Sequence, residues 1–109
     1  MTNLEELMDG LPGEAMIRSG LADYQAGRRT VNALAAASAQ TRLREAGLLP
    51  GGLPAWPEPE LTLYRLLRQE PGDAYSRYNA ILRELSSFLN ALDRRLRLRG
   101  EAGGQGRRA

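Results

Sequence analysis

Hydrophobic residues between Ala74 and Arg99 recur in steps of three and four, which is the spacing of one face of an α-helix. The repeating positions are Tyr75, Tyr78, Leu82, Leu85, Leu89, Leu92 and Leu96, called here the heptad stripe. Ile81 and Phe88 widen the stripe on one side. An apolar surface of this length has to be buried, either against other helices of the same chain or against a second copy.

Four shorter helices are predicted before this one, over residues 3–9, 13–26, 29–46 and 59–69, with glycines and prolines between them. The third of these contains the run Ala33 to Ala39, which has high helix propensity but little side-chain bulk. Neighbouring helices can approach such a surface closely, so we expect this helix at the centre of the fold. No stretch alternates between apolar and polar residues, so no sheet is predicted.

Residues 47–58 contain three prolines and three glycines, which exclude a regular helix. A loop of this length in a small domain is often functional or mobile. Leu53 and Trp56 favour a loop that docks on the body of the fold, and the alternative is that Trp56 binds a partner.

Together these elements predict an all-α fold, a small helical bundle of four to five helices with a long C-terminal helix and one Pro/Gly-rich loop. We expect residues 1–99 to form a single helical domain and residues 100–109 to form a flexible basic tail. The acidic N-terminal residues lack the apolar core of a secretory signal, and no apolar run approaches the ~20 residues that span a bilayer. We therefore expect a cytoplasmic protein without a membrane partner.

The residue types that are missing restrict the chemistry. The chain has no cysteine or histidine, and all fifteen of its basic residues are arginine, so it has no lysine either. Thiolate nucleophiles, imidazole bases, Schiff-base lysines, phosphate-binding P-loops and the commonest metal ligands are therefore excluded. We predict a non-enzymatic protein that binds no cofactor and no metal.

The final helix is long relative to its neighbours. Residues 73–99 would span about 40 Å, whereas the third and fourth helices would reach only about 26 Å and 17 Å. Part of the final helix therefore overhangs or meets another molecule. Our leading hypothesis is protein–protein association, as a homodimer or an accessory subunit. Its predicted interface residues are Leu85, Leu89, Leu92, Leu96 and Trp56, with the second half of the stripe, from Leu92 to Arg99, as the main candidate surface.

One segment, from Leu21 to Leu34, resembles the helix-turn-helix segment of bacterial regulators: a helix, a turn containing Gly27, and an Arg–Arg–Thr–Val run that opens a second helix. The resemblance implies that Arg28, Arg29, Thr30 and Asn32 face DNA.

Charge is divided unevenly along the chain. Residues 1–60 carry a net charge of −3 and residues 61–109 carry +5. The basic residues at the end of the final helix are Arg94, Arg95, Arg97 and Arg99. They can complement the negative end of the helix dipole. They also support an alternative hypothesis, a DNA- or RNA-binding regulator that uses the helix-turn-helix-like segment and the Arg-rich C-terminus.

Overall fold

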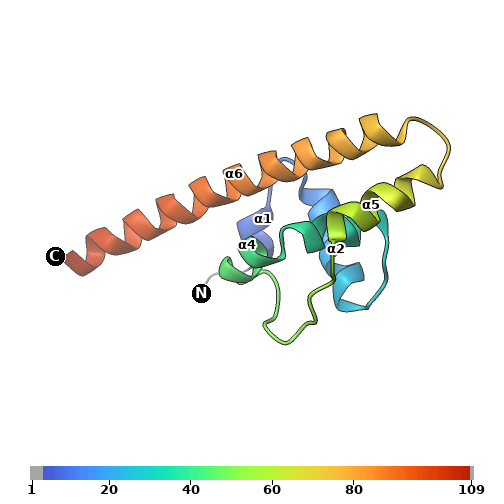
Figure 1. The fold of residues 1–109 in the computed structure, drawn as a ribbon. Helices are drawn as coiled ribbons and strands as arrows, with labels where there is room; N and C mark the ends of the chain where they lie inside the picture. The colour runs from blue at the N-terminus through green and yellow to red at the C-terminus, as the bar shows by residue number, and fades with distance from the viewer. Residues whose placement is uncertain (1–3, 109) are drawn as a thin grey trace.

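Helices are the only regular elements in the computed structural model, which describes the backbone of residues 4–108 and the side chains of residues 6–100. In chain order they are α1 (Leu4–Met8), α2 (Glu14–Gln25), α3 (Val31–Ser38), α4 (Gln40–Glu45), α5 (Pro59–Arg68) and α6 (Ala74–Arg108). Figure 1 shows that α6 lies across the other helices and that its C-terminal part extends beyond them. The predicted all-α bundle with a long C-terminal helix is confirmed.

The predicted third helix, residues 29–46, is two helices in the structure, α3 and α4. They meet at Ala39, whose φ of −112° and ψ of 21° are not helical. The Ser38 hydroxyl donates a hydrogen bond to the carbonyl of Leu34 at 2.9 Å, and such bonds bend helices. The N–H of Ala39 bonds to the carbonyl of Ala36, one residue nearer than in an α-helix. The chain therefore tightens and changes direction at this point.

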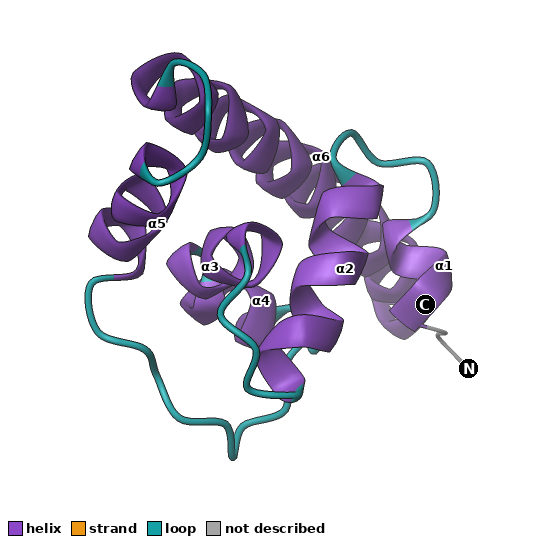
Figure 2. Cartoon of the chain, turned by 90° about the vertical axis from the view of Figure 1, so that its right-hand side faces the viewer, coloured by secondary structure: helices purple, strands orange, loops and turns teal. Residues whose placement is uncertain are grey.

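Helix α3 occupies the centre of the bundle, as predicted, and packs against α2, α5 and α6. Figure 2 views it nearly end-on with these three helices around it. Residues 33–37 are all buried, and four of the five are alanine. Helix α2 approaches most closely at Gly20, where an added Cβ atom would lie 2.2 Å from the carbonyl oxygen of Asn32. Glycine is required for this contact because no other residue leaves space for the α3 backbone.

Helix α6 contributes Leu85, Phe88, Leu89 and Leu92 to the core. Most of the first half of the heptad stripe therefore packs within the chain as predicted, although Tyr75 at its start is 65% exposed. Close packing continues where α2 begins, because a Cβ at Gly13 would lie 3.1 Å from the side chain of Glu84 and 3.2 Å from its carbonyl oxygen. The core is thus closed over by the middle of α6.

The backbone of α6 continues to Arg108, past the predicted end at Arg99. The side chains of residues 101–109 lie outside the described residues. The flexible basic tail expected over residues 100–109 stays a prediction.

The loop before α5 is docked on the body of the fold. Trp56 is buried, with its ring centroid 4.5 Å from that of Tyr24. The Tyr24 hydroxyl donates to the carbonyl of Pro54 at 2.9 Å and lies 3.0 Å from the side-chain amide of Gln40. Arg44 donates to a further loop carbonyl, that of residue 53, at 2.9 Å. These contacts confirm that the loop docks on the body of the fold.

Polar side chains cap the first turns of α3 and α6. The Thr30 hydroxyl accepts a hydrogen bond from the first turn of α3 and donates to Asp23 at 2.7 Å. Asp73 accepts backbone N–H bonds from Tyr75 at 3.0 Å and Ser76 at 3.2 Å, so it caps the first turn of α6. The pKa of Asp73 is lowered, chiefly by the Ser76 hydroxyl, and the pKa of Asp23 is lowered by the Thr30 hydroxyl and then by Arg28.

Candidate functional site

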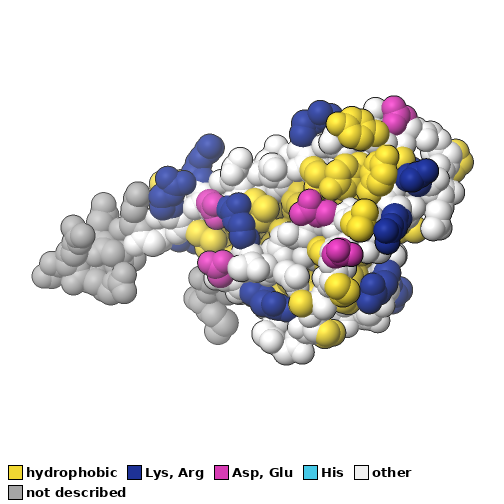
Figure 3. All heavy atoms as spheres, viewed as in Figure 1, with side chains coloured by type: hydrophobic (Ala, Val, Ile, Leu, Met, Phe, Trp, Pro, Cys, Tyr) yellow, Lys and Arg dark blue, Asp and Glu magenta, His cyan; other side chains and the backbone are white. Residues whose placement is uncertain are grey.

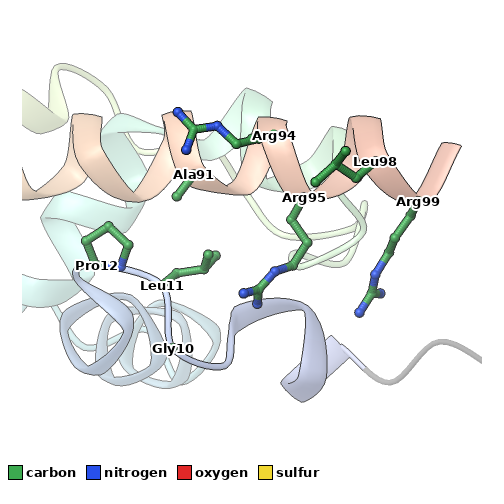
Figure 4. Close-up of a pocket in the computed structure, with 8 residues that line it drawn as sticks. All are labelled: Gly10, Leu11, Pro12, Ala91, Arg94, Arg95, Leu98 and Arg99. Atoms are coloured by element: carbon green, nitrogen blue, oxygen red, sulfur yellow. The ribbon is translucent and has the colours of Figure 1, made fainter. Parts of the chain in front are cut away.

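A groove of about 520 Å³ lies between the turn that joins α1 to α2 and the outer segment of α6, residues 91–100. Figure 4 shows the eight residues that line it. The turn contributes Gly10, Leu11 and Pro12; α6 contributes Ala91, Arg94, Arg95, Leu98 and Arg99. The volume falls within the range of pockets that bind ligands or peptide side chains. We call this feature the α6 groove.

Apolar side chains form the floor of the α6 groove. Leu11 is buried, Ala91 is half-buried and Pro12 is exposed. Leu98 is 60% exposed, one of three large apolar side chains that are exposed among the described residues. Leu98 lies outside the heptad stripe, since it follows Leu96 by only two residues and therefore points in a different direction from it. The floor is therefore buried at Leu11 and exposed to solvent at its outer end, where Leu98 lies.

Arg95 fixes one wall of the groove. Its Nη1 atom donates to the carbonyl oxygens of Glu6 at 3.3 Å, Leu7 at 3.0 Å and Asp9 at 2.7 Å. Carbonyls at the end of a helix have no partner within the helix, and a guanidinium group is well suited to bind several of them. Arg95 therefore holds the end of α1 against α6.

A second network stiffens the turn from within. The Glu14 carboxylate accepts from the N–H of Gly10 at 2.9 Å and from Nε of Arg18 at 2.6 Å, and Arg18 also pairs with Asp9 at 2.9 Å. Hydrogen bonding to Arg18, followed by the bond from Gly10, lowers the pKa of Glu14. The turn is therefore held in position by its own side chains.

Three arginines of the outer segment have no partner among the side chains described. Arg94, Arg97 and Arg99 are exposed and form no hydrogen bond or ion pair with residues 6–100. In Figure 4, Arg94 points away from Leu11 and Pro12, whereas Arg99 points to the side on which α1 lies. On the face drawn in Figure 3, arginine side chains are the outermost charged groups of the described part of α6. The apolar floor therefore has positive charge on both sides that no carboxylate of residues 6–100 compensates.

None of the five predicted interface residues lines the α6 groove. Leu85, Leu89 and Leu92 are buried on the inner face of α6, and Trp56 is buried where its loop docks on the fold. Leu96 is half-buried beside a different hollow, between α4 and α6. Leu98 lies within the predicted surface from Leu92 to Arg99, whereas the sequence pattern did not indicate Leu11 or Pro12. No local signal in the sequence relates these two residues to the end of α6.

The hollow beside Leu96 is crossed by one ion pair, between Arg42 of α4 and Asp93 of α6. A smaller hollow of about 320 Å³ lies on the other side of Arg42, where Thr41, Ser86 and Glu60 are among the lining residues. The charges of Arg42 and Asp93 neutralise each other, and the other charged lining residues are acidic, Glu45 in the first hollow and Glu60 in the second, so neither hollow has the cluster of arginines that lines the α6 groove.

The segment that resembles a helix-turn-helix is occupied by internal contacts. Arg28 pairs with Asp23 at 2.9 Å, and the guanidinium of Arg29 lies 4.8 Å from the ring centroid of Trp56. Thr30 caps α3, and Asn32 faces Gly20 through its backbone. The helix that would read DNA is α3, the central helix of the bundle, and its buried residues 33–37 cannot enter a groove of DNA.

Residues 6–100 contain no group of three or more carboxylates placed to hold a metal ion. Within the described backbone, no helix has both the length and the apolar character that a bilayer-spanning segment needs. Comparison of the chain with protein-family models, curated proteins and solved structures finds no match.

Proposed function

We propose that this chain is a non-enzymatic binding protein that associates with another protein through the α6 groove. The observation that carries the proposal is the exposure of Leu98 beside arginines that have no carboxylate partner in the described residues. An exposed apolar patch with a polar rim is typical of protein interaction sites, and arginine is enriched in them.

The position of the groove also supports this proposal. Arg95 and Glu14 hold the turn and α6 in fixed positions, so a partner would not have to order the site when it binds. Preorganisation of this kind raises affinity because less conformational freedom is lost on association.

A different protein is favoured over a second copy of this chain. Four of the six residues from Arg94 to Arg99 are arginine, and two copies that met through these segments would bring like charges together. The leucines that could have formed a symmetric seam are covered by the chain's own helices. Light scattering would test whether the chain associates with itself, and we expect it to measure the mass of a monomer.

Selection from a displayed random peptide library would test the proposal, with the full chain as bait and the Leu98→Gln variant for counter-selection. Because Leu98 is 60% exposed, we expect the variant to keep its fold, which circular dichroism would verify. The proposal predicts enriched peptides that bind the wild-type chain about tenfold more tightly than the variant. A library that yields no peptide sensitive to Leu98 would overturn it.

Nucleic-acid binding is the competing function, and the same unpaired arginines favour it. A gel-shift assay with duplex DNA and single-stranded RNA would distinguish the two functions. Binding that weakens steeply with salt and is indifferent to Leu98→Gln would indicate phosphate contacts. We expect no retarded band at physiological salt.

A further inference from the structure

We infer that the segment bound by the α6 groove is an acidic peptide with one large apolar side chain flanked by carboxylates. This inference rests on the proposed function and names the chemistry of its partner. It follows from the arrangement of apolar and charged groups in the groove.

The apolar anchor is indicated by the floor. Leu11, Ala91 and Leu98 line one hollow, and Pro12 adds a rigid apolar edge. A polyanion without apolar groups would leave Leu98 in water, so the floor would add nothing to its binding. A leucine or phenylalanine side chain placed against Leu98 would remove apolar surface of both molecules from water.

The flanking carboxylates are indicated by the arginines. Arg94 and Arg99 are five residues apart, which corresponds to about 7.5 Å along the helix axis. They leave α6 in different directions, so the apolar floor lies between two cationic groups. Because neither has a carboxylate partner among residues 6–100, an acidic ligand would break no ion pair with the side chains described. Arginine can also bind a carboxylate through two parallel hydrogen bonds.

Arg95 has a separate role in the groove. Its Nη1 atom is occupied by three backbone carbonyls, so it positions the turn and contributes its charge at short range. Arg94 and Arg99 are therefore the residues to change when ligand binding is tested, because replacing Arg95 would also release α1.

Three fluorescein-labelled synthetic peptides of equal length would test the inference by fluorescence anisotropy with the full chain. The first has one phenylalanine flanked by glutamates, the second replaces the glutamates with glutamines, and the third replaces the phenylalanine with serine. We expect the first to bind at least tenfold more tightly than either of the others. We also expect its affinity to decrease as salt is raised.

Variants of the protein would then locate the binding. We expect Leu98→Gln to weaken the first peptide about tenfold and the Arg94→Gln/Arg99→Gln double variant to weaken it about five- to tenfold. Arg83→Gln is the matched control, since Arg83 is an exposed arginine of the same helix that does not line the groove, and it should leave the affinity unchanged. Thermal unfolding of each variant would verify that the fold is intact.

The possible outcomes separate this inference from the proposed function. Equal, Leu98-dependent binding of the glutamate and glutamine peptides would overturn the acidic partner and leave protein association standing. Equal binding of the glutamate and serine peptides, or complete displacement by duplex DNA, would overturn the apolar anchor and favour a polyanion site. If none of the three peptides binds, the inference is wrong. If the library also yields no Leu98-sensitive peptide, the proposed function fails as well.

Discussion

Replacing Gly20 with alanine should destabilise the fold, although alanine is the better residue in the interior of a helix. Intrinsic propensity alone would favour Gly20→Ala by about 0.5–1 kcal/mol. The added Cβ, however, would lie 2.2 Å from the carbonyl oxygen of Asn32, and ordinary contacts of a Cβ atom begin at 3.4 Å. Helices α2 and α3 would have to separate by about 1 Å at the centre of the core. A backbone shift of this kind is what overpacking a core produces.

Overpacking a core costs about 1–3 kcal/mol, and an obstacle in the backbone belongs at the upper end of that range because it cannot rotate away. After the gain in propensity is subtracted, we expect the free energy of unfolding to fall by about 2 kcal/mol. Urea denaturation followed by circular dichroism and by the fluorescence of Trp56, the only tryptophan, would measure it. The control is Ser19→Ala, at the exposed neighbouring position of α2, which should change stability by a few tenths of a kcal/mol. A Gly20→Ala variant as stable as the wild-type chain would refute this account of the contact between α2 and α3.

Three further predictions concern the loop, the caps and the end of α1. Tyr24→Phe removes the hydrogen bond to the Pro54 carbonyl, so it should lower the free energy of unfolding by about 1 kcal/mol. It should also speed proteolysis of residues 47–58. Tyr75→Phe is the control, because Tyr75 is exposed. Folding lowers the pKa values of Glu14, Asp23 and Asp73, so the unfolded chain binds more protons than the folded chain as the pH falls. The urea concentration at the midpoint of unfolding should therefore decrease between about pH 5 and pH 3, and it should decrease less steeply in Asp73→Asn. A midpoint that rises on acidification would contradict these pKa shifts. Arg95→Gln should accelerate amide hydrogen exchange in α1 and in the turn after it, which mass spectrometry would measure. The control variant Arg97→Gln should leave this exchange unchanged. Equal protection in both variants would mean that the three bonds to backbone carbonyls do not hold α1.

Local signals in the sequence located most helix boundaries. Pro59 and Asp73 mark the starts of α5 and α6, and Gly27 follows the end of α2. These residues act within one turn of their own position, so a linear pattern contains the information. The break at Ala39 was missed because the surrounding alanines favour a continuous helix, and the hydrogen bond from Ser38 becomes decisive only when both helices are packed.

The candidate site could not be predicted from local sequence signals. Arg95 meets carbonyls that precede it by 86 to 89 positions, and no periodicity relates such distant residues. The length of the heptad stripe indicated a partner, and the structure instead covers Leu85, Leu89 and Leu92 with helices of the same chain. The arginines of the outer segment were singled out from the sequence as a candidate surface, and that role stays a prediction. Their relation to Leu11 and Leu98 required the three-dimensional arrangement.

The bonds from Arg95 to α1 also bear on the order in which the chain acquires its structure. Helices α2 and α3 are adjacent in sequence and share the most extensive packing in the fold, so we expect them to associate while the chain is still being synthesised. The end of α1, in contrast, cannot receive the hydrogen bonds of Arg95 until residue 95 has left the ribosome. Until then the leucines and alanines that α6 covers remain accessible to chaperones. Helix α1 is therefore among the last parts of the protein to become stably folded. Protection of its backbone amides from hydrogen exchange would indicate that synthesis of α6 has passed residue 95.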